Sequence, residues 1–258
     1  MNVPFDALTK SEVLEHIQKY LEGTLQHHIA TANPEMLLHA QHDEEFRHIL
    51  HQTSINTPDG IGIIWAANVQ KNSLLTSLFK LLTLPFHKPK SPIPERITGA
   101  DLFLEICQEA AIKHQKIFLL GGKEGVAEKT KQHLEKLYPE IQIVGTHEGT
   151  HSMHEQEKIK DIINDASPDI LFVAYGAPAQ EKWIARNLQK IPSVKVAIGV
   201  GGTFDFVSGV IPRAPLLLRK IGLEWLYRLI KEPKKRWRRI KNATIIFPWR
   251  FLRERDQK

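Results

Sequence analysis

A single carboxylate, Asp59, stands where it could do acid–base chemistry. It lies in Thr57-Pro58-Asp59-Gly60, where forming a turn is the ordinary role of an aspartate. A carboxylate that reaches a reacting hydroxyl can also remove its proton as a general base. The sequence contains no Asp-x-Asp pair of the kind that commonly holds a metal ion. From the residues alone both roles stay open for Asp59, and the missing acid pair leads us to expect no metal and no cofactor.

Glycine clusters follow three expected strands and are candidates for holding phosphate or nucleotide. Glycine lets the backbone approach a phosphate, and a helix that starts there supplies N–H donors. A tight strand-to-helix turn explains the first cluster equally well. Its spacing is not Gly-x-Gly-x-x-Gly, and the next strand runs into Gly145-Thr146 without an acid to hold a ribose. A nicotinamide dehydrogenase is thus disfavoured, while a single nucleotide is not. The candidate residues are Gly121, Gly122, Gly176, Gly201, Gly202 and Asp205.

Four polar residues near strand ends are candidates for binding substrate. Thr31 and Asn33 leave the first strand, although an asparagine before proline often only starts a turn. Gln180 falls in the first turn of a helix, and its neighbour Glu181 is explained by helix capping. Arg96 is suited to a diphosphate, or it pairs with a neighbouring carboxylate.

The elements that must position these residues alternate along the chain. The patterns predict strands near 28–31, 116–120, 142–144, 170–174 and 194–200. Helices are expected over 10–24, 35–40, 43–51, 102–111, 154–165 and 181–189, and from the Gly121-Gly122 turn to about 137. Nearly all-apolar strands alternating with helices indicate an α/β fold, a parallel sheet covered on both faces. Ligands of such sheets bind beyond the carboxyl ends of the strands, where the candidate residues fall.

Two further features bear on cellular context. The lone Cys107 rules out an internal disulfide and fits a reducing compartment. We find no signal leader and no apolar run of the roughly 18 to 20 residues that span a bilayer, which predicts a cytoplasmic protein with at most a peripheral hold on a membrane. The apolar stretch 74–86, within an insertion over 68–94, is either a core helix or an interfacial helix.

The carboxyl-terminal segment differs sharply from the rest of the chain. Residues 216–258 contain 14 Lys and Arg against four Asp and Glu, a net charge of +10. Because the whole chain carries +6, residues 1–215 carry about −4. Trp225, Trp237 and Trp249 are interleaved with these cations, a composition typical of segments at a membrane interface. We therefore divide the chain into a catalytic body, 1–210, and a basic amphipathic appendage, 211–258, that contacts an anionic membrane surface.

Taken together, the sequence resembles the bacterial WecG/TagA/CpsF glycosyltransferases over nearly its whole length. The words that carry the resemblance occur in order: Thr31-Ala-Asn33-Pro-Glu, Asp59-Gly-Ile-Gly-Ile, Glu95-Arg96-Ile-Thr-Gly99, Phe118-Leu-Leu-Gly-Gly122, Tyr175-Gly-Ala-Pro-Ala-Gln180-Glu181, Gly199-Val-Gly-Gly-Thr-Phe-Asp205, Pro212-Arg213-Ala-Pro215, Gly222-Leu-Glu-Trp225-Leu-Tyr-Arg228 and Glu232-Pro233. The stretch between Asn68 and Pro94 looks longer than the corresponding link in the family.

The resemblance implies a Rossmann-like fold and inverting transfer of a hexosamine-type sugar, N-acetylmannosamine or its uronic acid, from a UDP-sugar donor. The acceptor would be a polyprenyl-pyrophosphate-linked sugar used for cell-surface polysaccharide, at the inner face of the membrane. By the same resemblance Asp59 is the base, and Thr31, Asn33, Arg96 and Gln180 lie at the substrate. Arg228 and Arg238 of the appendage are candidates to meet the diphosphate.

Two other classes of function remain as alternatives. A nucleotide-sugar hydrolase or epimerase would act on the donor without a lipid acceptor. A nucleic-acid-binding protein could use Lys234–Lys241 to track phosphates, but no recognised reading motif accompanies that run and its Trp and Leu content suits lipid better. We accordingly expect no nucleic-acid partner. The donor sugar, the acceptor and the oligomeric state, homo-oligomer included, stay open.

Overall fold

The computed structural model describes residues 1–69, 76, 91–150, 152–220 and 223–256. The elements of the body, in chain order, are α1 (Lys10–Glu22), β1 (His27–Ala32), α2 (Pro34–Ala40), α3 (Glu44–Gln52), β2 (Ile55–Pro58), α4 (Ile61–Val69), α6 (Gly99–Ile112), β3 (Lys116–Gly121), α7 (Val126–Leu137), β4 (Gln142–His147), the 3-10 turn η1 (Met153–Glu155), α8 (Gln156–Ala166), β5 (Ile170–Ala174), α9 (Ala179–Asn187), the 3-10 turn η2 (Leu188–Lys190), β6 (Val196–Gly199) and α10 (Thr203–Val207). The appendage contains α11 (Leu216–Lys220), α12 (Glu224–Lys231), α13 (Pro233–Lys241), the π-helical turn η3 (Asn242–Ile246) and α14 (Phe247–Arg255).

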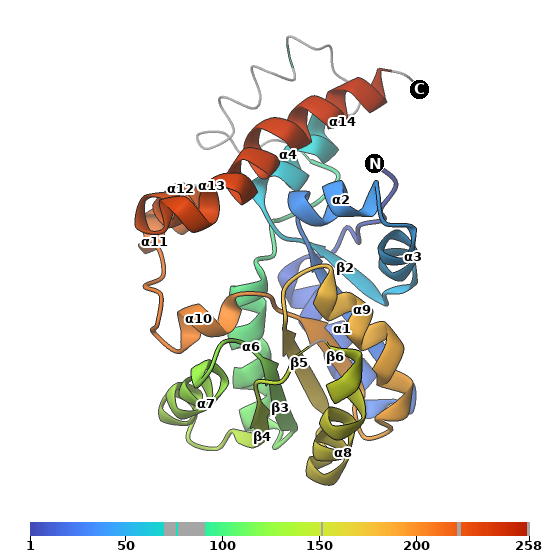
Figure 1. Cartoon of the computed structure of the whole chain (residues 1–258), viewed down its shortest axis with the longest axis vertical. Helices are drawn as coiled ribbons and strands as arrows, with labels where there is room; N and C mark the ends of the chain where they lie inside the picture. Colours follow the sequence, from blue (N-terminus) through green and yellow to red (C-terminus); the bar gives the residue numbers. More distant parts are fainter. Residues whose placement is uncertain (70–75, 77–90, 151, 221–222, 257–258) are drawn as a thin grey trace.

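The strands of the described chain form one six-stranded parallel sheet in the order β2-β1-β6-β5-β3-β4. Helices cover both faces of the sheet (Figure 1). In β3, Ile117 and Leu119 pack with α1, α6 and α7, while Phe118 and Leu120 pack with α8 and α9. This alternation buries both faces, so the predicted covered parallel sheet is confirmed.

The chain changes face between two neighbouring strands, β1 and β6. After β1 it passes into α2 and α3, and α3 packs beside α9. After β6 it passes into α10, which packs against α6 and α7 on the other face. Loops that diverge in this way open a crevice at the carboxyl ends of the two strands, which is where ligands of such sheets bind.

Most predicted elements are confirmed, with two differences in the strands. Thr9 caps α1 together with Glu12 in a reciprocal capping box. The sequence analysis did not identify β2, whose four residues include polar Asn56 and Thr57, although all four are buried. Strand β4 continues to His147 rather than ending at 144, so Glu148 follows the strand directly. The expectation of no acid near that strand end was therefore wrong.

The appendage folds back onto the body through its last helix. In Figure 1, α14 lies along α4. Phe247 is fully buried and packs in one apolar cluster with Trp65 and Val69 of α4. Phe251, in the same helix, meets Trp65 edge-on with 5.7 Å between ring centroids. The predicted boundary at 210/211 thus separates two segments that share a core.

Most of the insertion over 68–94, including nearly all of the stretch 74–86, lies outside the described residues. Across the described residues, no helix combines the length and apolarity needed to cross a bilayer.

Candidate active site

Asp59 sits at a corner where β1, β2 and α6 meet. Its backbone N–H donates to the carbonyl of Ala32 at 2.9 Å, which fastens the end of β2 to the end of β1. Its Oδ2 accepts a hydrogen bond of 3.2 Å from the N–H of Gly99, the first residue of α6. The start of a helix stabilises negative charge. The structure therefore holds the Asp59 carboxylate at the carboxyl edge of the sheet, where the sequence placed the candidate base.

Thr31 and Gly99 extend this corner to the next strand. The Thr31 hydroxyl donates to the carbonyl of Gly199, at the end of β6, over 3.0 Å. A Cβ on Gly99 would lie 3.1 Å from the same hydroxyl oxygen, so a larger residue there would press on Thr31 where α6 meets β1. Thr31 is buried. Its observed role is to hold the strands and helix together at the corner.

Asn33 caps the start of α2, whereas the sequence suggested the start of a turn as its structural role. Its side-chain oxygen accepts hydrogen bonds from the N–H groups of Glu35 (3.0 Å) and Met36 (3.1 Å). This is the usual work of an asparagine at the N-cap, and Pro34 follows at the position where helices tolerate proline.

Gln180 joins two of the glycine loops. Its Oε1 accepts hydrogen bonds from the N–H groups of Gly176 at 3.0 Å and Gly201 at 2.9 Å. Its Nε2 donates to Glu181 at 2.8 Å. A Cβ on Gly199 would stand 2.4 Å from Glu181 Oε1, so both side chains press directly against the backbone of β6. Gln180 thus fixes the loops after β5 and β6 relative to one another.

Glu181 is the deeply buried carboxyl of this site, which the sequence explained only as a helix cap. It is fully buried, and its Oε2 has no hydrogen-bond partner among the described residues. Burial raises the pKa of Glu181 to about 7, against the opposing effect of hydrogen bonds from Gln180 and from its own backbone. The group therefore titrates near neutrality.

The remaining glycine candidates lie at the ends of β3 and β6. Gly121 has φ of +96°, and a Cβ there would stand 2.9 Å from the carbonyl carbon of Ala174, so the tight turn requires glycine. The Gly122 N–H donates to the Ala174 carbonyl at 3.2 Å. Gly202 precedes α10, and Asp205 lies in the first turn of that helix, half-buried. These loops line the same edge of the sheet as the Asp59 corner.

The predicted arginines lie around the appendage. Arg96 donates to the backbone carbonyl of Arg219 in α11 at 2.6 Å, so it contacts the appendage rather than a carboxylate. Arg238 of α13 lines a cavity of about 290 Å³ beside α2, together with His39 and Arg250. Arg228 is a residue of α12, and its side chain lies outside the described part of the structure.

An ion-pair group that the sequence analysis did not assign lies in the first turn of α6, the helix whose first residue, Gly99, donates to Asp59. Asp101, in the first turn of α6, forms ion pairs with Arg213 (2.6 Å) and Arg219 (3.6 Å). Burial opposes ionisation of Asp101, but the Thr98 hydrogen bond and the two arginines outweigh it and lower its pKa. The available signal was Arg213 in Pro212-Arg213-Ala214-Pro215, a word matched to the family without a role.

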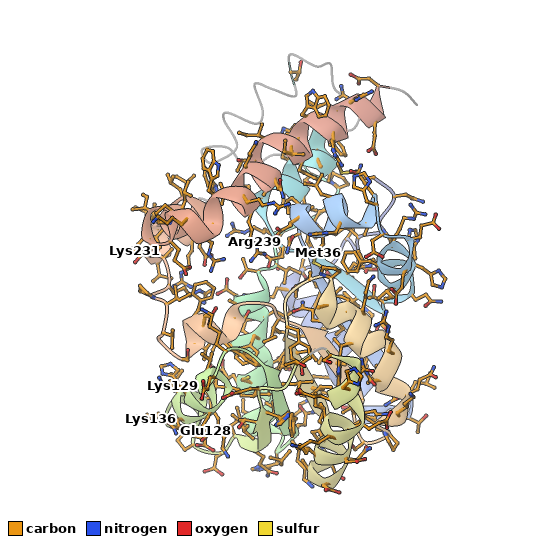
Figure 2. The ribbon with its side chains drawn as sticks, viewed as in Figure 1. Met36, Glu128, Lys129, Lys136, Lys231 and Arg239 are labelled. Atoms are coloured by element: carbon orange, nitrogen blue, oxygen red, sulfur yellow. The ribbon has the colours of Figure 1, made fainter. Side chains whose placement is uncertain are left out.

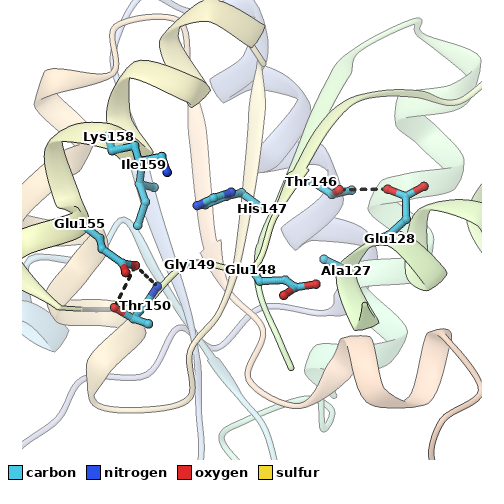
Figure 3. Close-up of a pocket in the computed structure, with 10 residues that line it drawn as sticks. All are labelled: Ala127, Glu128, Thr146, His147, Glu148, Gly149, Thr150, Glu155, Lys158 and Ile159. Carbon is cyan, nitrogen blue, oxygen red and sulfur yellow. Dashed lines mark hydrogen bonds between the residues drawn. The ribbon is translucent and has the colours of Figure 1, made fainter. Parts of the chain in front are cut away.

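A cavity of about 510 Å³ opens beside the carboxyl end of β4 (Figure 3). Strand β4 is one outer strand of the sheet, and β2 is the other. Six strands spaced as usual place β4 about 24 Å from β2. Three glutamates line the cavity, and two of them hydrogen-bond threonines within it: Glu128 with Thr146 at 3.0 Å and Glu155 with Thr150 at 3.1 Å. The third, Glu148, accepts from the N–H of Gly125 in the loop that follows β3. Because three glutamates and one lysine, Lys158, line the cavity, it suits a ligand with hydroxyl and N–H donors better than a phosphate.

His147, His151 and His154 lie close together in the sequence, in a spacing that only loosely resembles a set of metal ligands. Within the described ranges, no group of three or more His, Cys, Asp or Glu side chains is arranged to hold a metal ion. His151 lies outside those ranges.

Comparison with known proteins agrees with this architecture along the whole chain. The profile of the glycosyl transferase WecG/TagA/CpsF family matches residues 1–258. An N-acetylglucosaminyldiphosphoundecaprenol N-acetyl-beta-D-mannosaminyltransferase of Bacillus subtilis is 32% identical over 240 residues, covering 93% of this chain and 85% of the relative. A protein of the same name from Staphylococcus aureus is 31% identical over 242 residues, with the same coverage. The chain therefore belongs to the WecG/TagA/CpsF family of glycosyl transferases.

Proposed function

We propose that this glycosyl transferase moves N-acetylmannosamine from a UDP donor to a polyprenyl-diphosphate-linked N-acetylglucosamine, with inversion at the anomeric carbon. Both named relatives carry the acceptor and the transferred sugar in their names. The observation that carries the proposal is the Asp59 corner. There one carboxylate, held by the first N–H of α6, stands at the carboxyl edge of the sheet beside the glycine loops.

The reaction follows from this placement. Asp59 accepts the proton of the acceptor hydroxyl while that oxygen bonds to the anomeric carbon. The bond from that carbon to the diphosphate oxygen breaks on the opposite face, and UDP leaves with the bonding electrons. The negative charge that develops on UDP is stabilised by arginines and by N–H groups of the glycine loops, which are fixed in advance and lose little on reaction. Thr31 and Gln180 contribute by holding these loops in register.

We place the two ends of the donor by the chemistry of the residues at the carboxyl ends of the strands. The acid-lined cavity at β4 suits the hydroxyl and N–H groups of a nucleoside. The glycine loops of β3, β5 and β6 lie between that cavity and the Asp59 corner in the strand order. In this proposal the sugar lies at Asp59, the diphosphate lies over the neighbouring glycine loops, and the nucleoside extends toward β4. Gly121, Gly122, Gly176, Gly201, Gly202 and Asp205 remain our proposal for contacts to the nucleotide.

The appendage supplies the contact with the lipid phase in this proposal. Its exposed apolar residues include Leu226, Ile230, Trp237 and Trp249, set among its many cations. Figure 2 shows Lys231 at the outer end of the appendage and Arg239 against α2, where its Nε pairs with Glu35 at 2.6 Å. Each basic residue near an anionic leaflet contributes about 1 kcal/mol. We infer that the enzyme works at the inner face of the cell membrane.

The decisive experiment follows the labelled sugar of UDP-N-acetylmannosamine with and without polyprenyl-diphosphate-N-acetylglucosamine. Label should enter the lipid fraction only when the acceptor is present. Free sugar released at the same rate without acceptor would identify a hydrolase, and conversion to another UDP-sugar would identify an epimerase. The same assay in a chelator should retain full turnover. Loss of turnover that Mn²⁺ restores would refute the metal-free mechanism.

A further inference from the structure

The carboxyl of Glu181 sets the direction in which the amide of Gln180 faces. Because Gln180 Oε1 accepts from the N–H groups of Gly176 (3.0 Å) and Gly201 (2.9 Å), its Nε2 needs an acceptor on the opposite side. Glu181 Oε1 is that acceptor, at 2.8 Å. If the amide turned over, its NH2 group would face two N–H donors. Through Gln180, Glu181 therefore keeps the loops after β5 and β6 together.

The Gln180–Glu181 pair is closed off from water. Glu181 is 0% exposed and Gln180 is 2% exposed. A Cβ on Gly199 would stand 2.4 Å from Glu181 Oε1 and 2.5 Å from Gln180 Nε2, so the two side chains lie directly against the backbone of β6. Burial without a counter-charge penalises a carboxylate far more than a neutral carboxyl. An ionised Glu181 therefore gains hydration only when the neighbouring loops move apart.

The strands that α9 covers present no charge to Glu181 near neutral pH. Strands β5 and β6 contain no titratable side chain. In β1, burial lowers the pKa of His28 to about 3 and also lowers the pKa of His27, so both imidazoles are neutral at pH 7. Burial raises the pKa of Tyr175, which follows β5, so its hydroxyl is neutral as well. The sheet side of α9 offers no counter-charge to an ionised Glu181.

The charges of α9 and α3 lie in partly exposed ion pairs. Lys182 Nζ lies 2.7 Å from Asp43 and 2.8 Å from Glu45, and Arg186 pairs with the same Glu45. The other charged or titratable residues of α3 and η2 are Glu44, Arg47, His48, His51 and Lys190. The pKa of Glu181, about 7, is set first by burial, against the hydrogen bonds from Gln180 and from its own backbone. Glu181 thus holds its proton up to neutral pH and loses it above.

The Gln180–Glu181 pair is also linked to the corner that holds Asp59. It lies against Gly199, whose carbonyl accepts from the Thr31 hydroxyl at 3.0 Å. A Cβ on Gly99 would lie 3.1 Å from that hydroxyl, and the Gly99 N–H donates to Asp59. A movement of the loops after β5 and β6 therefore changes the glycine loops proposed for the donor and the strand next to the proposed base.

We propose that Glu181 is a positioning residue of the transferase: its protonated form orients Gln180, which holds the loops after β5 and β6 in the arrangement that binds the nucleotide-sugar donor. Loss of that proton at higher pH draws water to the carboxylate, separates the loops and weakens donor binding. Glu181 acts through Gln180 and does not touch the donor, because it is fully buried. The inference rests on the proposed function and adds a pH response to it.

The test measures KM for UDP-N-acetylmannosamine from about pH 6 to about pH 8 in the wild type and in Glu181→Gln. Glutamine keeps an oxygen that accepts from Gln180, but it cannot ionise. Apparent affinity scales with the fraction of protein in the binding-competent form, so the wild-type KM should rise roughly tenfold over this range. The KM of Glu181→Gln should match the wild type at about pH 6 and lack this rise. Comparing the two proteins at each pH cancels the titration of other groups.

Two further variants separate the hydrogen bond from the charge. Glu181→Met removes the acceptor for Gln180 at every pH, so its KM should be raised already at about pH 6 and should rise no further. The matched control is Glu45→Gln, which removes an exposed carboxyl that pairs with Lys182 and Arg186 of the same helix. It should keep the wild-type pH profile.

A KM that rises equally in the wild type and in Glu181→Gln overturns the inference. Hydrogen exchange on the wild-type protein tests it without any variant and without activity. Relative to intrinsic rates, protection of the Gly176 and Gly201 amides should fall over the same pH range, while the Gly122 amide, which donates to the Ala174 carbonyl, keeps its protection. Constant protection at Gly176 and Gly201 also overturns the inference. Falling protection in a protein that transfers no sugar supports the positioning by Glu181 and refutes the proposed function.

Discussion

The amide of Gln180 donates a 2.8 Å hydrogen bond to the carboxyl of Glu181, and the two side chains lie buried against Gly199 of β6. Through its other end, Gln180 accepts from the backbone of two loops, at Gly176 and Gly201. This buried pair therefore couples the carboxyl ends of β5 and β6. Its geometry leads to the first two predictions.

Gln180→Ala should destabilise the protein and impair turnover together. The change leaves the N–H groups of Gly176 and Gly201 without their acceptor and Glu181 without its donor, at a cost of roughly 2 kcal/mol or more. Chemical denaturation measures the stability, and the transfer assay measures the rate. The control is Gln189→Ala, at an exposed position of η2 just beyond α9. A Gln180→Ala enzyme as stable as the control would show that the two loops do not depend on this amide.

Glu181 should make stability fall as pH rises through mildly acidic values. Burial raises its folded pKa to about 7 from an ordinary 4.5, so between these values the folded state holds a proton that the unfolded state has lost. Stability from this group is complete below about pH 4.5 and declines by roughly 3 kcal/mol up to about pH 7. Glu181→Gln removes the titrating group while keeping its shape. Its unfolding free energy should lack this decline, and identical pH dependence in the two proteins would contradict the assignment.

Two aromatic residues two positions apart in the appendage should behave differently. Phe247 is fully buried against α4, whereas Trp249 is 58% exposed. Phe247→Ala should cost about 3–5 kcal/mol of packing and release α14, seen as faster hydrogen exchange in that helix. Trp249→Ala should change stability by no more than about 0.5 kcal/mol, yet weaken sedimentation with anionic liposomes. Equal liposome binding by Trp249→Ala and the wild type would remove this tryptophan from the membrane contact.

These point substitutions separate membrane contact from folding better than a truncation after Val210 would. Removing residues 211–258 would also uncover Trp65 and Val69, the partners of Phe247 in their shared core. Loss of activity in a truncated chain would then not separate membrane contact from damage to the body.

The sequence predicted the sheet well because its central strands are apolar on both faces. An all-apolar strand such as Ile170–Ala174 is typical of a parallel sheet that is covered on both faces. It failed at β2, where Asn56 is buried by contacts that only the fold supplies: its side chain donates to the carbonyl of Leu50 at 2.6 Å. A four-residue strand with two polar side chains carries no strand pattern of its own.

The candidate site likewise contains residues that the sequence identified and residues that it did not. Asp59, Thr31 and Gln180 were identifiable because motifs mark the ends of strands, and the structure brings them to one edge. The partners were not identifiable, since Gly99 reaches Asp59 only when α6 packs on the sheet, and Arg213 reaches Asp101 only when segment 211–220 docks on α6. The docking of α14 was also hidden, because Phe247 and Leu252 are dispersed among arginines and an exposed tryptophan.

The most direct measurement of the central claim is the turnover of Asp59→Asn alongside its affinity for UDP. Asparagine keeps the size of the side chain and an oxygen to accept from Gly99, but it cannot take a proton from the acceptor hydroxyl. The account predicts a loss of roughly 10²–10⁴ in kcat with UDP binding close to wild type. Near-wild-type turnover by Asp59→Asn with UDP bound normally would show that another group is the base.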